Sequence, residues 1–562
     1  MGVGRWTFAI FTLMMRRALI YAALALGSII FTWPFIWMAA TSAKLERELF
    51  RQQPRTLPQS PGPRLQSPYV DTRLFADVNG TRMDETLSLI GAALSRMNYT
   101  WPQDLNPAEL RKEASRGIYA RLLNTLPADH WQKSSAELGQ EIAAAISPQL
   151  IADIVANLRR VFCVGQLRIR SYDLQEEQLI AGQDAAANWV TAGSAPARLV
   201  SAESGGDRYA ELHYDFSQGD LVTLSQTFTT SFPVSRLHRI QLYLRNDDTW
   251  HAITLFVERS GQRLQAQHPV DDCDYNWIVD TWQEPGPDDR LDKIRTWTLL
   301  RPIASGPQFT NGPNQIKISV ELSRRNLGQA WAAKILHNYR LTFDYIPFWR
   351  YVETSLFLVI LNLAGTLISC SLVAYSFARL QWPGRTASFA LLLGTMMIPP
   401  QVTMIPQFLI FQKLGWYNTL KPLWVMSFFT TAFSVFLIRQ FMKGIPRDLE
   451  DAARIDGCGF LRIYWHIILP LIKPALAVVA IFTFLATWND FMGPLIYLND
   501  QRLYPLSFGL YAFQIQSLQP GTMAGIGMLM AGSLLMTLPV IAIFFFAQRY
   551  FLQGVTLTGI KG

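Results

Sequence analysis

Apolar runs long enough to cross a lipid bilayer constrain this chain more than any other feature. One run lies near the N-terminus, at about 18–40. Five more follow residue 345, at about 353–378, 388–411, 421–440, 474–497 and 524–548. Because a transmembrane helix needs about 20 predominantly apolar residues, the sequence predicts a polytopic α-helical membrane protein with six transmembrane helices.

Basic residues beside these runs predict the topology. They gather at the N-terminus and after the second, fourth and sixth runs, at Arg5, Arg16, Arg17, Arg379, Arg385, Arg439, Lys443, Arg447, Arg454, Arg462, Arg549 and Lys561. Six spans place all of them on one side, which the positive-inside rule makes cytoplasmic. We therefore expect a multi-pass membrane protein with both termini in the cytoplasm. The large polar segment that this topology exports and the scarcity of cysteine favour a bacterial inner membrane. The net charge of +8 suits the lipid bilayer as a partner, and no nucleic acid is expected.

A polar insert of about 300 residues, 45–344, separates the first apolar run from the others. It is too long for a loop and predicts one or two folded domains outside the cytoplasm. Its first part, 45–165, has apolar residues at helical spacing in 83–97, 107–126 and 135–162.

The second part of the insert, 166–344, changes to an alternation of apolar and polar residues, with Gly, Asn, Asp and Pro between the runs. The predicted strands are 167–170, 209–216, 221–232, 238–245, 252–258, 296–300 and 315–322. At least seven short strands predict an antiparallel β-sandwich or jelly roll. The predicted domains are therefore 1–44, 45–165, 166–344 and the helical core 345–562.

Two groups of residues in the insert leave alternatives open. Its tryptophans either stack on sugar rings or, more commonly for a β-sandwich, pack in the core; they are Trp189, Trp250, Trp277, Trp282 and Trp297. Cys163 and Cys273 either form one disulfide or are unrelated. The four cysteines lack the spacing of a zinc site, so no metal and no cofactor are expected.

The stretch 447–474 lies on the predicted cytoplasmic side between two apolar runs. Its first half carries acids early and small alanines in the middle, which suits a short exposed helix whose acids lie near its positive N-terminal pole. Gly457 and Gly459 are predicted to break that helix, since glycine adopts the positive φ of sharp turns. A second amphipathic run, 460–469, precedes Pro470 and Pro474. Together they predict a helix-turn-helix beside the membrane.

The spacing of Asp451-Ala452-Ala453, three residues, Gly457, nine residues, Ile467, one residue and Leu469-Pro470 resembles the "EAA" loop of importer-type ABC transporter permeases. The resemblance extends over 17–44 and 345–562 and is closest to the carbohydrate (MalG-like) group. It implies a permease fold and a coupling helix that rests on a separate ATPase. The coupling residues would be Glu450, Asp451, Ala452, Ala453, Asp456, Gly457, Ile467, Leu469 and Pro470. Asp451 replaces the family's usual Glu.

The resemblance also implies the partners: an ABC ATPase dimer, a second, MalF-like permease subunit and an extracytoplasmic solute-binding protein. The sequence contains no phosphate-binding G-x-x-x-x-G-K-[ST] motif, so the chain is expected not to hydrolyse ATP itself. The C-terminal residues Gly559, Ile560, Lys561 and Gly562 are similar to the tail with which sugar-importer permeases contact the ATPase.

Polar residues within the apolar runs are candidates for a solute pathway, because a polar group in hydrocarbon usually faces the bundle interior or water. Trp488, Asn489 and Asp490 could stack on and hydrogen-bond a sugar, or could equally lock neighbouring helices together. Gln401 is a further candidate, and Asn362 and Gln407 are weaker ones.

The resulting hypothesis is a permease subunit of an ATP-driven importer, with a sugar or oligosaccharide as the expected solute. Three alternatives remain: import of a non-sugar solute, a membrane-anchored sensor that uses the insert as its ligand domain, and a secondary transporter. The sensor lacks a cytoplasmic signalling module, and the secondary transporter needs ionisable residues in several spans.

Overall fold

The computed structural model describes residues 3–49, 56–58, 82–101, 107–158, 160–173, 177–180, 186–204, 207–214, 216, 219–246, 250–271, 277–286, 289–303, 312–517 and 525–556. The chain forms two compact units. The membrane unit comprises Met1–Ser42, Arg290–Arg295 and Leu341–Gly562, and the insert unit comprises Ala43–Asp289 and Thr296–Arg340. Each is described by itself below.

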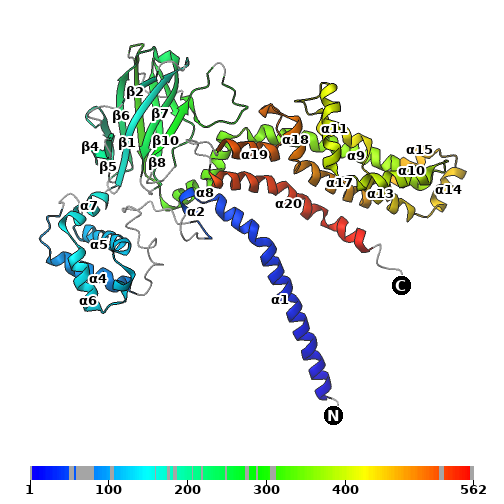
Figure 1. The fold of residues 1–562 in the computed structure, drawn as a ribbon, viewed down its shortest axis with the longest axis horizontal. Helices are drawn as coiled ribbons and strands as arrows, with labels where there is room; N and C mark the ends of the chain where they lie inside the picture. The colour runs from blue at the N-terminus through cyan, green and yellow to red at the C-terminus, as the bar shows by residue number, and fades with distance from the viewer. Residues whose placement is uncertain are drawn as a thin grey trace. The chain divides into compact units, whose positions relative to one another are not determined.

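The membrane unit is built from helices (Figure 1). They are α1 (Val3–Ser42), α9 (Phe348–Arg379), α10 (Arg385–Gly394), α11 (Pro400–Lys413), α12 (Lys421–Val425), α13 (Ala432–Lys443), α14 (Asp448–Ile455), α15 (Phe460–Ile463), α16 (Leu469–Leu471), α17 (Lys473–Trp488), α18 (Met492–Tyr497), α19 (Leu506–Ser517) and α20 (Ile526–Thr556). In the described part of the chain, four helices are long and apolar enough to cross a membrane, or up to six if each of two bent pairs is one span.

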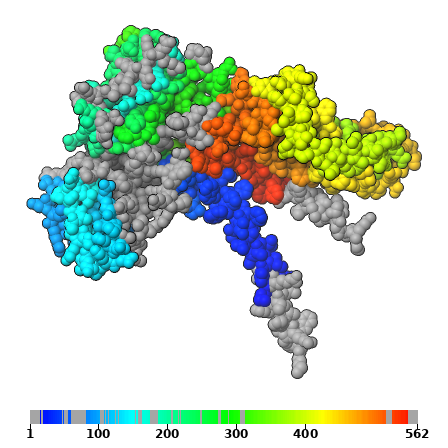
Figure 2. All heavy atoms as spheres, viewed as in Figure 1, coloured from blue at the N-terminus to red at the C-terminus, as the bar shows by residue number. Residues whose placement is uncertain are grey.

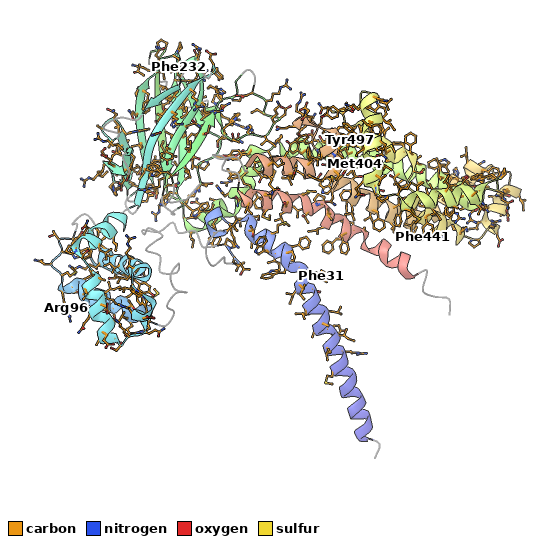
Figure 3. All side chains as sticks on the ribbon, viewed as in Figure 1. Phe31, Arg96, Phe232, Met404, Phe441 and Tyr497 are labelled. Atoms are coloured by element: carbon orange, nitrogen blue, oxygen red, sulfur yellow. The ribbon has the colours of Figure 1, made fainter. Side chains whose placement is uncertain are left out.

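Helix α1 carries its apolar side chains at the molecular surface (Figure 2). The side chain of Phe31 is 80% exposed and extends away from the helix (Figure 3). Exposed apolar side chains along an apolar helix are stable in lipid or against another apolar helix.

Three of the predicted spans are broken, and one of them, 474–497, divides into α17 and α18 at residues 489–491. The run 388–411 forms α10 and α11, which meet at 98°. The break falls at Ile398 and Pro399, which have extended backbones; proline lacks the N–H that would continue the helix. The run 421–440 is interrupted between α12 and α13 at Thr430, whose φ is +71°.

A tight helix contact accompanies the break at Thr430. A Cβ on Gly365 of α9 would lie 2.4 Å from the Ser427 hydroxyl oxygen, so only glycine allows the segment around Ser427 to lie this close to α9. No helix was predicted for 498–523, yet α19 lies there. A Cβ on Gly509 of α19 would likewise lie 2.2 Å from the ring of Tyr351 on α9.

The first part of the insert unit is helical, as predicted. It contains α4 (Met83–Arg96), α5 (Pro107–Thr125), α6 (Ser135–Ala145) and α7 (Pro148–Leu158). The prediction of one helical run over 135–162 was wrong, because Pro148 starts a separate helix and a strand begins at Arg160. Ser134 and Glu137 form a capping box at the start of α6.

The second part of the insert unit is rich in β-structure. Its strands are β1 (Arg160–Ser171), β2 (Glu177–Ile180), β3 (Val190–Gly193), β4 (Ala197–Ser204), β5 (Asp207–Tyr214), β6 (Leu221–Thr229), β7 (Leu237–Arg245), β8 (Ala252–Arg259), β9 (Gln262–Ala266), β10 (Ile278–Gln283), β11 (Thr298–Ile303) and β12 (Gln315–Ser323). All seven predicted strands are present, and β2, β3, β4, β9 and β10 were missed.

The strand order is β3-β6-β12-β8-β9-β11-β10-β7-β1-β5-β4, with β2 paired to β1. We call the part from β10 to β4 the first half-sheet and the part from β3 to β11 the second half-sheet. The two are joined by a short parallel pairing of β10 with β11, whereas the other pairings are antiparallel. One apolar cluster contains residues of both halves, such as Leu242 of β7 and Ile318 of β12.

Most of the tryptophans of the insert are buried. Trp189, Trp250, Trp282 and Trp297 are all at most 9% exposed, which confirms the packing alternative for them. Trp277 is only partly buried. Cys163 is buried, and Cys273 lies outside the described residues, so the proposed disulfide remains untested.

Candidate functional site

The coupling segment begins with the short helix α14. Three acids occupy its first turn, where they complement the helix dipole. Gly457 ends the helix with a φ of +81°. The N–H of Cys458 donates to the carbonyl of Ala453 (2.9 Å), and the N–H of Gly457 donates to that of Arg454 (3.0 Å). These two bonds form a Schellman motif, so the predicted turn at Gly457 is confirmed.

Gly459 does not share this role. Its φ is −74°, within the range of any residue, and it stands at the start of α15. The prediction that Gly459 needs a positive φ was therefore wrong.

The second half of the coupling segment contains a π-helical turn that was not predicted from the sequence. Residues Tyr464–Ile468 form one turn of π-helix between α15 and α16. The hydroxyls of Tyr464 and Ser371 on α9 are hydrogen-bonded at 2.7 Å, and the Tyr375 hydroxyl donates to the carbonyl of Phe460 at 3.2 Å. These contacts fasten the segment to α9.

A buried ion pair joins α14 to the membrane helices. The Arg379 guanidinium at the end of α9 lies 2.9 Å from the carboxylate of Glu450, and both side chains are only 3% exposed. Arg379 also donates to the carbonyls of Met442 and Ile445 (2.8 Å for Ile445), just at and after the end of α13. One guanidinium therefore connects α9, α13 and α14, and Glu450 faces the protein interior.

Four apolar side chains of the coupling segment are exposed to solvent. Leu449, Ile455, Phe460 and Leu461 are 47%, 86%, 57% and 68% exposed, and we call these four residues the docking face. None of them was predicted as a coupling residue. The helical period gives a signal for Ile455, because a helix that buries Glu450 and Ala453 directs the side chain of residue 455 outward.

Some of the predicted coupling residues are exposed and others are buried against the membrane helices. Asp451, Ala452 and Asp456 are exposed, and Asp451 forms an ion pair with Arg454 at 3.2 Å. Ala453 is buried among core residues of α9 and α13.

The remaining predicted contact residues lie later in the chain. Ile467 and Leu469 are half-buried against the same core as Ala453, and Pro470 is exposed. The predicted tail contact at Gly559, Ile560, Lys561 and Gly562 lies outside the described residues.

The predicted pathway residues of α17 are mostly engaged in structural contacts. Trp488 is 2% exposed, stacks on Phe484, and donates its indole N–H to the carbonyl of Met536 at 3.0 Å. Asp490 accepts from the N–H of Gly493 at 3.1 Å and thereby caps α18. Asn489 is exposed, although its amide also donates to the carbonyl of Leu485.

The other pathway candidates lie on different helices. Gln401 is exposed in the first turn of α11, and Gln407 is half-buried on the same helix. Asn362 of α9 is 9% exposed and donates to the carbonyls of Leu358 and Leu423. It therefore ties α9 to α12.

Comparison with known proteins places the helical core in a family. Residues 357–557 match the model of the "Binding-protein-dependent transport system inner membrane component". The arabinooligosaccharides transport system permease protein AraQ of Halalkalibacterium halodurans is 35% identical over 38% of this chain and 75% of its own length. The AraQ protein of Bacillus subtilis is also 35% identical, over 44% of this chain and 87% of its own length.

Two further similarities were found. The trehalose/maltose transport system permease protein MalG of Thermococcus litoralis is 28% identical over 47% of this chain and 90% of its own length. A solved bacterial ABC transporter for import of the acidic polysaccharide alginate matches 38% of this chain and 79% of its own, at 25% identity and a TM-score of 0.35. The chain therefore belongs to the carbohydrate-type permeases among the binding-protein-dependent transport system inner membrane components, and it is the membrane-spanning subunit of an ABC importer.

Proposed function

We propose that this permease receives the motion of its ATPase through the docking face and transmits it through the Arg379–Glu450 pair. The pair is the observation that carries the proposal. It ties the coupling helix to α9 and α13, while four apolar side chains of α14 and α15 remain exposed. An exposed apolar patch on a short polar helix indicates a protein interface. A displacement of α14 is then passed to two membrane helices as a rigid-body movement.

The docking face reassigns the roles within the coupling segment. Leu449, Ile455, Phe460 and Leu461 make the apolar contact with the ATPase, and Asp451, Ala452 and Asp456 border it. Glu450, Ala453, Ile467 and Leu469 hold the segment on the membrane helices, Gly457 sets the turn, and Pro470 leads into α17. Residues 559–562 remain proposed as a second contact with the ATPase.

The assembly follows from the family. ABC importer permeases have no ATPase of their own, and separate subunits hydrolyse ATP while a solute-binding protein delivers the solute. We infer that the second membrane subunit is a different, MalF-like permease, since α1 presents apolar side chains that a neighbouring helix would cover.

The protein is a multi-pass protein of the inner membrane. We infer six spans, with the bent pair α10–α11 counted once and α17 with α18 as the fifth span, both termini in the cytoplasm and the insert outside. The basic residues at the ends of the spans support this orientation. In the insert we infer a β-sandwich, supported by the apolar cluster that the two half-sheets share.

The expected solute is an oligosaccharide. The AraQ relatives carry arabinooligosaccharides in their names, and a relative from Bacillus subtilis is a melibiose/raffinose/stachyose import permease. Asn489 and Gln401 are exposed and remain proposed contacts for sugar hydroxyls. Trp488 and Asp490 are proposed to shape the same pathway by fixing α17 and α18, because their polar groups are already hydrogen-bonded.

Co-purification tests the docking face. The permease complex with Ile455→Asp should lose its ATPase subunits in mild detergent, since a carboxylate in an apolar interface is costly. Leu414→Asp is the matched control, because Leu414 is also exposed (55%) but lies at the end of α11. Retention of the ATPase and of solute-stimulated ATP hydrolysis by Ile455→Asp would disprove the proposal.

A further inference from the structure

Three basic residues gather at the end of the membrane unit that carries α14. Arg385 begins α10, and Arg439 and Lys443 lie toward the end of α13, which packs beside α10 (Figure 1). The charges that act on the Lys443 ammonium are those of Arg439 and Arg385, and the charge that acts on Arg439 is that of Arg385. In the described part of the chain, none of the three forms an ion pair with a carboxylate. We call these three residues the basic cluster.

The acidic residues that follow α13 do not offset the basic cluster. Glu450 is buried against Arg379, and Asp448 is exposed on α14 and is not among the groups whose charge acts on Lys443. Arg385 adds a further cost, because it lies in the first turn of α10, next to the positive pole of that helix, and this turn contains no acid. The positive-inside rule accounts for basic residues on this side of the membrane, but not for their position beside one another.

Backbone hydrogen bonds hold both guanidinium groups of the cluster in place. Arg439 donates to the carbonyl of Phe377 at 3.2 Å, and its guanidinium carbon lies 3.9 Å from the ring centre of Phe389. Arg385 donates to the carbonyl of Leu380 at 2.9 Å. A guanidinium has five N–H donors, so each of the two keeps further donors for an anion. Because the groups are already oriented, little side-chain entropy would be lost on binding.

The surroundings of the cluster are those of a membrane interface. Trp382, three residues before Arg385, is 36% exposed and packs against Phe377 with ring centres 5.6 Å apart. Tryptophan is enriched at the level of the lipid headgroups. Leu391 on α10 and Phe433 on α13 are 74% and 47% exposed. The helices that carry the cations therefore also present apolar side chains that acyl chains can cover.

We propose that the basic cluster binds the phosphate of an anionic phospholipid. The guanidinium forks match phosphate oxygens with parallel hydrogen bonds, and the Lys443 ammonium adds a point charge. Basic pockets between membrane helices are suited to acidic headgroups, and the exposed apolar side chains favour a lipid over a free phosphate. A bound headgroup ties α10 to α13, whose end Arg379 also holds. The site goes beyond the coupling proposal, since it contains no residue of the docking face.

Native mass spectrometry of the detergent-purified permease complex, titrated with dioleoylphosphatidylglycerol, tests the site because it resolves single bound lipids. Each basic residue near a membrane surface contributes about fivefold to the affinity for anionic lipid. Arg439→Gln with Lys443→Gln should therefore weaken binding of the tightest lipid about twentyfold. Lys443→Gln alone should weaken it about fivefold, and this variant keeps the hydrogen bond of Arg439. The matched control is Arg462→Gln with Lys473→Gln, which removes two exposed basic residues of the coupling segment and should leave binding unchanged.

Unchanged binding of phosphatidylglycerol in both variants would overturn the proposal, as would equal affinity of the natural protein for zwitterionic phosphatidylcholine. Displacement of the lipid by inorganic phosphate, as effective as displacement by added phosphatidylglycerol, would reassign the cluster to free phosphate. Loss of the ATPase from the double variant with unchanged lipid binding would reassign it to the ATPase interface. The Ile455→Asp complex should bind the lipid normally, so failure here is distinct from failure of the coupling proposal.

Discussion

At the scale of single residues, Arg379 and Glu450 are the pair on which the coupling segment depends. Replacing one partner leaves a charge buried at 3% exposure, which costs about 3–5 kcal/mol. We expect Arg379→Met or Glu450→Gln to lower the thermal unfolding temperature of the purified complex and to uncouple ATP hydrolysis from solute. Asp451→Asn is the control, because the Asp451–Arg454 pair is exposed and contributes little. Equal behaviour of all three variants would contradict the assigned role of Arg379.

The two glycines of the turn give a second test at this scale. Gly457→Ala places an alanine at a φ of +81°, with open space around its Cβ, so only the backbone is strained. The expected loss of stability is about 1–2 kcal/mol. Gly459→Ala should have almost no effect, because its φ is ordinary and its Cβ also meets open space. Chemical denaturation of both variants checks this, and a larger loss for Gly459→Ala would refute it.

At the scale of elements, His238 at the start of β7 makes the stability of the sheet depend on pH. Burial lowers its pKa, Arg239 adds to the effect, and Asp289 at 3.9 Å opposes it. The unfolded chain, with a histidine pKa of about 6.5, then takes up the proton more readily than the folded chain. Stability is therefore unaffected above about pH 6.5 and falls as the pH decreases below that value through the folded pKa.

The measurement is a denaturation midpoint at pH 7.5 and at pH 5.5. His238→Gln should reduce the difference between the two pH values. An unchanged difference in His238→Gln would rule out this origin.

Among the elements, those with a strong repeating pattern were predictable. Helices α4 and α5 and strands β6, β7, β8 and β12 lie within a few residues of their predicted bounds, because their apolar residues recur at regular spacing. Strands β3 and β9 were missed because each is short, at four and five residues, so it carries little pattern. The π-turn at Tyr464–Ile468 was missed because nothing in a local sequence reports a hydrogen bond to Ser371 on another helix.

At the scale of the whole molecule, topology is the main prediction. In a background without other cysteines, Lys443→Cys should react with a membrane-impermeant maleimide only after cells are permeabilised. Gly261→Cys, in the β8–β9 turn, should react in spheroplasts that are intact. Both sites accept the probe, since Lys443 is exposed outside the docking face and a Cβ at Gly261 meets open space. The opposite pattern would reverse the orientation inferred from the basic residues.

The sequence by itself determined which segments are apolar enough for a membrane, which repeat as helix or strand, and where the coupling turn falls. These are local properties, set by hydropathy, side-chain periodicity and the φ of Gly457. Only the tertiary structure decided the roles of Glu450, Ala453 and Trp488, because burial and partners come from distant helices. It likewise decided which arginines of the insert share one face, since strand register brings Arg170 beside Arg239 across 69 positions of the chain.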